Sequence, residues 1–165
     1  MSLAIPINSG FTLISVPTFS NDGIQLENAI KDARSLSDNA ITLGWRAELC
    51  GKLEEILERT KDIGWDGYDA IPISPKSRVL ADRFISLLPE GIVLPEITPE
   101  NSGFFSFDWI KSKDIVLSIS VENEKLIYAE IAGSKKTSGE LPFHDELPHE
   151  LSEILLRYFR VENIF

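Results

Sequence analysis

Three aspartates, Asp62, Asp66 and Asp69, lie within a few residues of Trp65 and Tyr68 in this chain of 165 residues. Carboxylates at this density could bind a metal ion or a basic group. Their spacing does not match a calcium loop, which requires alternating oxygen ligands, a central glycine and a closing glutamate. We therefore predict no metal here and take Trp65, Asp66, Tyr68 and Asp69 as candidate binding residues.

The same segment has a structural interpretation. Asp66-Gly67 is typical of a turn, because glycine readily adopts the positive φ that other residues resist. A tryptophan in a loop commonly buries its ring and gives its indole N–H one hydrogen-bond partner. The sequence leaves both interpretations of Trp65 and Tyr68 open, as core residues or as contact residues.

A second polar segment near the C-terminus contains His144, Asp145, Glu146, His149, Glu150 and Glu153. His149 and Glu153 would share one face of a helix. Acids in the first turn of a helix also complement its dipole without any ligand, and the segment lacks a recognised metal-ligand motif. We predict neither a metal nor a cofactor.

The sequence contains no Gly-x-Ser-x-Gly elbow, no phosphate-binding glycine loop and no dinucleotide fingerprint. Cys50 is the single cysteine, and it falls on the apolar face of a predicted helix, where we expect it to be buried. One cysteine cannot form an internal disulfide, which is typical of a reducing cytoplasm. We predict no catalytic residue.

The formal net charge of −10 argues against a nucleic-acid-binding protein, because such proteins need a basic surface to displace counterions from phosphates. An acidic surface is compatible with a basic protein partner. Residues 1–19 lack a basic n-region and are interrupted by Pro6 and Gly10. We therefore expect neither a signal peptide nor a membrane span, and a cytoplasmic protein.

Apolar residues recur at helical spacing in four segments, which predicts helices over residues 23–36, 43–61 and 75–88 and a last helix from about Pro148. Ser74 is expected to cap the third helix, with Pro75 at its first position. We predict that this helix buries Val79, Leu80, Phe84, Leu87 and Leu88. Residues 1–21 are predicted to form an N-terminal arm or an edge strand, and residues 22–165 a single domain.

From Ile92 onward the apolar residues alternate, which is typical of strands. We predict strands over residues 92–97, 105–109, 115–121 and 126–132, the last with Ile127, Ala129 and Ile131 on one face. Residues 133–139 are predicted to form a flexible polar loop, and residues 140–143 a marginal edge strand. The predicted fold class is α+β: an antiparallel β-meander of four to five strands with helices packed on one face.

Trp65-Asp66-Gly67, Ala70 and Pro72 form a W-D-G-x-x-A-x-P segment. A helix follows it, then Pro95-Glu96-Ile97 and a strand from Gly103 to Trp109. In this order the chain resembles an uncharacterised family of small bacterial proteins over residues 63–126. The resemblance implies a bacterial, cytoplasmic α+β protein and supplies no catalytic residue.

No specific function follows from these patterns. We expect a non-enzymatic protein-binding or accessory protein, since the chain is acidic, carries aromatic residues on a turn and lacks catalytic motifs. Its partner would be a protein, and a basic one would complement its charge. The alternative is a small hydrolase that uses acidic residues near Trp65 or in the segment from His144 to Glu153. The sequence is also compatible with a homodimer.

Overall fold

The computed structural model describes residue 31 and residues 44–161. By its internal contacts the chain divides into two units, Met1–Asn39 and Ala40–Phe165, and residues 44–161 belong to the second. The arm or edge strand predicted at residues 1–21 and the domain boundary that follows it lie outside the described residues. So does the predicted helix at 23–36, except for Lys31, which is helical.

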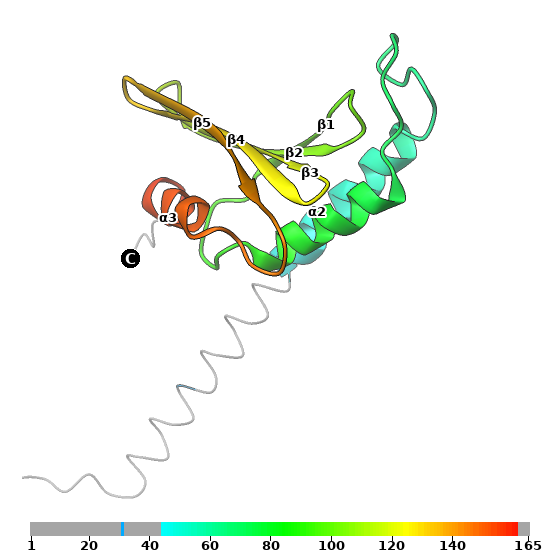
Figure 1. The fold of residues 1–165 in the computed structure, drawn as a ribbon. Helices are drawn as coiled ribbons and strands as arrows, with labels where there is room; N and C mark the ends of the chain where they lie inside the picture. The colour runs from blue at the N-terminus through cyan, green and yellow to red at the C-terminus, as the bar shows by residue number, and fades with distance from the viewer. Residues whose placement is uncertain (1–30, 32–43, 162–165) are drawn as a thin grey trace, which may run out of the picture. The chain divides into compact units, whose positions relative to one another are not determined.

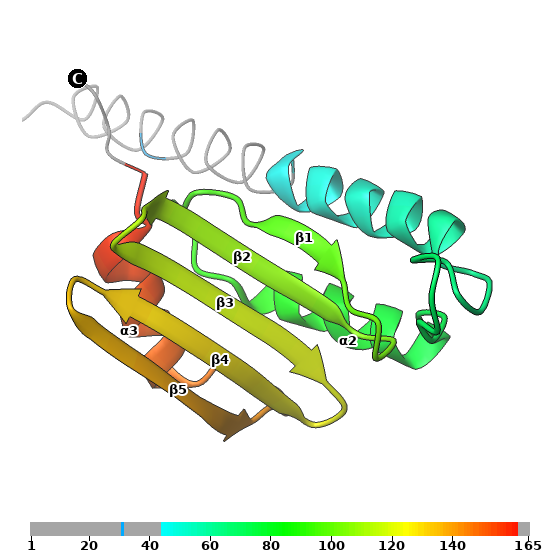
Figure 2. The same cartoon turned by 90° about the horizontal axis from the view of Figure 1, so that it is seen from above.

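Five antiparallel strands form one sheet in the order β1-β2-β3-β4-β5, so each strand pairs with its neighbour in sequence. The strands are β1 (Glu96–Pro99), β2 (Phe105–Ser112), β3 (Ile115–Glu122), β4 (Lys125–Ala132) and β5 (Lys135–Pro142). The helical residues 44–59, α2 (Pro75–Leu87) and α3 (His149–Tyr158) lie on one face of this sheet (Figures 1 and 2). This arrangement confirms the predicted α+β fold with an antiparallel meander.

Alternation in β2 and β3 places one apolar set against the helices, as predicted. The buried side chains of these two strands that face the helices are Phe105, Phe107, Trp109, Leu117, Ile119 and Val121. The last helix is also confirmed, since Leu151, Ile154 and Leu155 of α3 are buried in the same core.

The start of α2 is confirmed, and so is the predicted burial of Phe84 and Leu88, but the rest of the buried face differs from the prediction. Ser74 Oγ accepts a hydrogen bond from the Ser77 amide at 3.0 Å, and Pro75 occupies the first turn. Val79 is 66% exposed, whereas Ser77 and Ala81 are buried. Apolarity alone misses this face because small residues let the helix approach its neighbours closely, and the Ser77 hydroxyl finds an acceptor in the Gly103 carbonyl at 2.9 Å.

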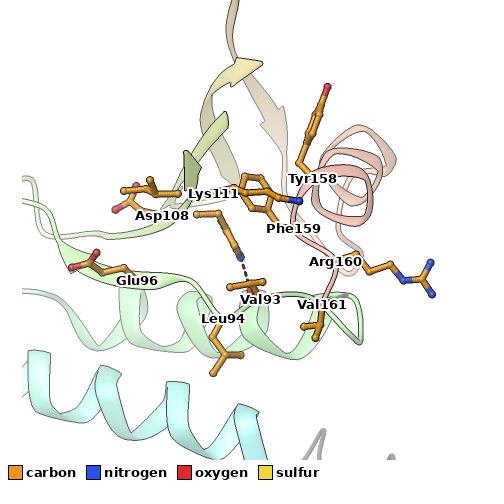
Figure 3. A pocket seen from close by; sticks show the side chains of 11 residues that line it. Val93, Leu94, Glu96, Asp108, Lys111, Tyr158, Phe159, Arg160 and Val161 are labelled. Carbon is orange, nitrogen blue, oxygen red and sulfur yellow. Dashed lines mark hydrogen bonds between the residues drawn. The ribbon is translucent and has the colours of Figure 1, made fainter. Parts of the chain in front are cut away.

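The strand predicted at residues 92–97 is wrong in its first part, since β1 begins only at Glu96. Ile92 instead forms an isolated antiparallel bridge with Arg160. The Val93 carbonyl accepts the indole N–H of Trp109 at 2.8 Å (Figure 3), and Pro95 has no N–H to donate to a ladder. The segment before Glu96 is therefore held by the Trp109 side chain, and pairing between β1 and β2 starts only at Glu96.

The β3–β4 turn decides which face of β4 is covered. Glu122 pairs with Lys125 across a two-residue turn, in which Asn123 has a positive φ of 54°. This register places Leu126 and Tyr128 on the helix side, where both are buried. The predicted set does share a face, but it is the face away from the helices, and it consists of Ile127, Ala129 and Ile131.

The predicted polar loop at residues 133–139 is wrong, because β5 is a full strand from Lys135 to Pro142. Its side chains are polar since an edge strand with few covered positions needs little apolar surface. Gly139 lies opposite Tyr128, and a Cβ there would meet the Tyr128 ring at 3.0 Å. The glycine thus makes room for the tyrosine, whose hydroxyl donates to Glu150 Oε1 at 2.7 Å and ties β4 to α3.

We expect Tyr128→Phe to lower the free energy of unfolding at pH 7 by about 1 kcal/mol, because the Glu150 carboxylate loses its buried donor. The hydrogen bond to Glu150, together with burial, raises the pKa of Tyr128 above its usual 10.0. The folded chain therefore holds this proton more tightly than the unfolded chain, and the stability it contributes is complete below about pH 10 and lost above it. Urea denaturation at pH 7, 9 and 10.5 should show a smaller alkaline loss in Tyr128→Phe than in the wild type.

Tyr158→Phe is the matched control, since the Tyr158 hydroxyl makes no hydrogen bond within the described residues. It should keep both the stability at pH 7 and the alkaline loss of the wild type. Equal behaviour of the two variants would contradict this assignment.

Candidate functional site

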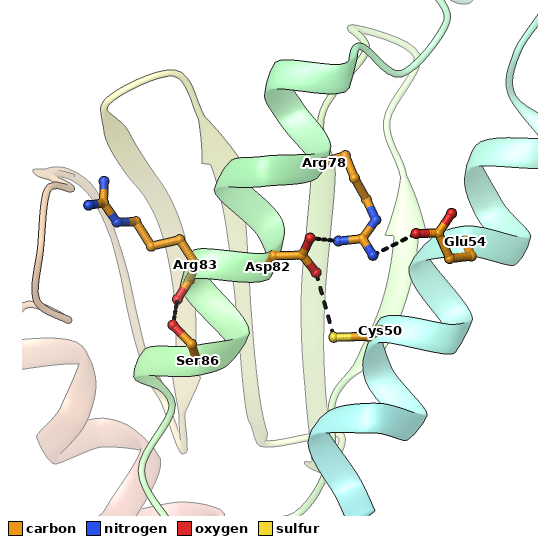
Figure 4. A network of polar contacts seen from close by, with 6 residues as sticks. All are labelled: Cys50, Glu54, Arg78, Asp82, Arg83 and Ser86. Carbon is orange, nitrogen blue, oxygen red and sulfur yellow. Dashed lines mark hydrogen bonds and ion pairs between the residues drawn. The ribbon is translucent and has the colours of Figure 1, made fainter. Parts of the chain in front are cut away.

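The segment that carries the candidate binding residues is a loop over residues 60–74, between the helical residues 44–59 and α2. Figure 1 shows it projecting beyond the ends of both helices. The two helices are joined by Arg78 of α2, which pairs with Glu54 at 2.8 Å and with Asp82 (Figure 4). Both ends of the loop are therefore attached to helices that this ion pair joins.

Cys50 belongs to the same contact between helices. Its thiol donates to Asp82 Oδ1 at 3.5 Å. The predicted burial of this side chain is wrong, since Cys50 is only half-buried. Its neighbour on the facing helix is the polar Asp82, which also pairs with Arg78, so this contact between the helices is polar.

Backbone hydrogen bonds close the loop on itself. The Gly64 amide donates to the Ala70 carbonyl and the Gly67 amide to the Gly64 carbonyl, both at 2.9 Å. Gly64 has a φ of 75°, and a Cβ at this position would lie 2.8 Å from the Tyr68 carbonyl oxygen. Only glycine fits there, so the loop conformation is encoded at this residue.

Asp66 and Trp65 hold the tip from within. Asp66 Oδ1 accepts from the amides of Tyr68 at 2.9 Å and Ala70 at 3.3 Å, which is an Asx-type turn. The half-buried Trp65 donates its indole N–H to the Ile71 carbonyl at 3.1 Å. These contacts fit the structural interpretation of both residues.

The C-terminal side of the loop is hydrogen-bonded to the turn between β1 and β2. The Ile71 amide donates to the Asn101 carbonyl at 2.8 Å. Ala70 and Ile73 are buried in the core. Gly103 has a φ of 86°, and a Cβ there would lie 3.1 Å from the Pro72 carbonyl oxygen, so the loop lies directly against the β1–β2 turn.

Three large apolar side chains point outward from this fixed loop. Tyr68 is 86% exposed, Ile63 is 83% exposed and Ile71 is 58% exposed. We call these three side chains the loop patch. Tyr68 therefore fits the contact interpretation, whereas its neighbour Trp65 fits the structural one.

The loop patch lies among negative charges. Asp62, Asp66 and Asp69 are all exposed, and Lys61 is already paired with Glu58 at 2.8 Å. The sequence identified the aspartates but not the two isoleucines, because an isolated apolar residue in a turn carries no periodicity that would mark it as exposed.

Two of the six side chains of the second polar segment, Asp145 and Glu150, make structural contacts. Asp145 pairs with Arg83, Glu150 accepts the Tyr128 hydroxyl and His149 opens α3. His144 and Asp145 line a shallow hollow of about 420 Å³. Within residue 31 and residues 44–161, no group of three or more His, Cys, Asp or Glu side chains is arranged to hold a metal ion.

No protein-family model, curated protein or solved structure matches this chain. The resemblance to an uncharacterised bacterial family therefore stays a prediction. In the part of the chain that the structure describes, no helix is long and apolar enough to cross a membrane.

We expect Asp66→Ala to open the loop locally, because the amides of Tyr68 and Ala70 lose their shared acceptor. Their hydrogen exchange should accelerate by about fivefold, which corresponds to one hydrogen bond of roughly 1 kcal/mol. Asp66→Asn keeps a side-chain oxygen and should exchange almost as slowly as the wild type. Unchanged exchange in Asp66→Ala, measured by NMR, would show that the backbone contacts alone hold the tip.

Proposed function

We propose that this chain is a non-enzymatic binding protein that docks a protein partner through the loop patch. The observation that carries the proposal is the 86% exposure of Tyr68 at the tip of a loop closed by its own hydrogen bonds. Removing a large, exposed aromatic ring from water is favourable, and a partner that buries it would provide this free energy.

The fixed loop favours binding because little conformational freedom remains to be lost. Tyrosine has only two side-chain torsions, and it is enriched among the residues that dominate the binding energy of protein interfaces. Ile63 and Ile71 flank it with apolar surface. A rigid aromatic anchor with apolar neighbours is the usual centre of such an interface.

Charge supports a basic partner. The loop presents Asp62, Asp66 and Asp69 to solvent, and the whole chain carries a formal net charge of −10. Complementary potentials steer association and select among partners. The single cysteine and the resemblance to small bacterial proteins support the bacterial cytoplasm as the place of this interaction.

The proposal is tested by photo-crosslinking at the loop. A benzoyl-phenylalanine in place of Tyr68 keeps an aromatic ring at the tip and should capture one basic protein in the native host. The same probe at Val79, which is 66% exposed on α2, is the control for general surface contact. Capture of the same proteins from both positions, or of none from position 68, would contradict the proposal.

Affinity for the captured protein gives the second measurement. Tyr68→Ala should weaken binding by roughly 30-fold, as expected for truncation of an interface anchor. Val79→Ala should leave the affinity unchanged, and both variants should keep the thermal stability of the wild type because both side chains are exposed. Equal affinity of Tyr68→Ala and the wild type would place the interface elsewhere.

A further inference from the structure

The edge of the sheet at β5 is a surface to which another strand can add. In the described part of the chain β5 pairs only with β4, and Figure 2 shows it as the outermost strand on its side of the sheet. It has eight residues, whereas β1 at the opposite edge has four and ends in Pro99. A long edge strand presents a row of backbone N–H and C=O groups to any chain that can align with it.

The turn between β4 and β5 determines which backbone groups of β5 face this edge. Ala132 and Lys135 are register partners across a two-residue turn, in which Gly133 has a positive φ of 64°. The pair that closes such a turn exchanges both of its backbone hydrogen bonds, and hydrogen-bonded pairs then alternate along an antiparallel ladder. The backbone groups that point away from β4 are therefore those of Lys136, Ser138 and Glu140.

The side chains of the same three residues lie on the open face of the sheet. Lys136 is opposite Ile131 and Glu140 is opposite Ile127 in the β4–β5 register, and these isoleucines are on the face away from the helices. Lys136, Ser138 and Glu140 are all exposed. A strand added at this edge therefore meets a cation at one end and a carboxylate at the other.

The sequence of β5 is complementary to itself when two copies run antiparallel. Lys136 and Glu140 lie at equal distances on either side of Ser138, so a two-fold axis at Ser138 sets each Lys136 opposite Glu140 of the second copy. Opposite charges directly across a sheet stabilise the pairing. This register joins residues 135–141 of both copies, and its hydrogen-bonded pairs are formed by the residues whose backbone groups face the edge.

Other registers lack this match. A shift by two residues in either direction places Ser138 opposite Lys136 or Glu140 and removes both charge pairs. Lysines on an edge strand commonly prevent pairing, and Lys136 would do so against a strand without a carboxylate at the matching position. Lys125 Nζ contacts Glu140 Oε2 at 3.0 Å, and Oε1 accepts no hydrogen bond from the described residues, so Glu140 can also receive Lys136 of the second copy.

The charge of the chain favours this edge over other surfaces for contact between copies. The formal net charge of −10 makes two copies repel each other in general. β5 is the only one of the five described strands with a net positive charge, since it contains two lysines and one glutamate. Two copies that approach through β5 therefore bring together a less negative part of their surfaces.

We propose that two copies of this chain pair through β5, antiparallel about a two-fold axis at Ser138, and form one continuous sheet with five strands from each copy. The loop of the loop patch is hydrogen-bonded to the β1–β2 turn, at the opposite edge of the sheet. Both loop patches therefore stay accessible in the dimer, and the proposal does not depend on their binding a partner.

The test is the mass of the full chain in solution, measured by analytical ultracentrifugation over a range of concentrations. The wild type should associate to a dimer. Lys136→Glu and Glu140→Lys should each weaken the dimer by about thirtyfold, because two-fold symmetry makes every change act twice. The double variant exchanges the two charges and should restore most of the affinity.

Lys113→Glu is the matched control, since it makes the same change of charge at an exposed lysine in the β2–β3 turn. It should leave the dimer unchanged. The monomers of all these variants should keep the thermal stability of the wild type, because the altered side chains are exposed and exposed ion pairs contribute little to folding.

Ser138→Pro tests the backbone pairing directly. Proline removes the N–H that faces the edge and leaves the hydrogen bonds to β4 in place, so this variant should be a folded monomer. In the wild type, amide hydrogen exchange at Lys136, Ser138 and Glu140 should slow as the protein concentration rises.

Three results would overturn the proposal. The first is a wild-type chain that stays monomeric at about 1 mM. The second is a dimer that Lys136→Glu, Glu140→Lys and Ser138→Pro leave intact, or that Lys113→Glu weakens equally. The third is a double charge variant that dimerises no better than the single variants, which would exclude the register about Ser138.

Discussion

The packing of one ring, Phe84, is the contact on which the rest of this structure depends. Phe84 is fully buried on α2. Its ring centroid lies 4.7 Å from that of Phe107, 6.0 Å from that of Phe143 and 6.5 Å from that of Trp109. These partners come from β2 and from the segment after β5, so one side chain joins three separate parts of the chain. Trp109 then positions Val93 through its indole N–H, which extends the same packing to the segment before β1.

The sequence was sufficient to predict those elements that are determined by residues close to one another in the chain. Ser74-Pro75 predicted the start of α2, and alternation predicted the buried faces of β2 and β3. The covered face of β4 could not be read in the same way, because it is set by the two-residue turn at Asn123 and not by the apolarity of Ile127 and Ile131. β5 was missed because its strand conformation comes from pairing with β4 and has little support from its own residues.

The candidate site was predictable in position but not in orientation. Trp65-Asp66-Gly67 indicated a turn, and the residue types could not say which of two aromatics faces water. Hydrogen bonds decide this: the indole of Trp65 has an acceptor inside the loop, whereas Tyr68 contributes only its backbone. The pocket lined by residues within 93–96, 108–111 and 158–161 left no signal in the sequence, since these three segments meet only after folding.

The order of the strands along the chain has a consequence for the assembly of the molecule during synthesis. Each strand pairs with the one made just before it, so the sheet can form hairpin by hairpin as the chain emerges, with short loops to close. The bridge between Ile92 and Arg160 is different, because it joins residues on opposite sides of the entire meander in sequence. This bridge is therefore completed only after all five strands have been made, and a nascent chain that already holds its loop patch still lacks it.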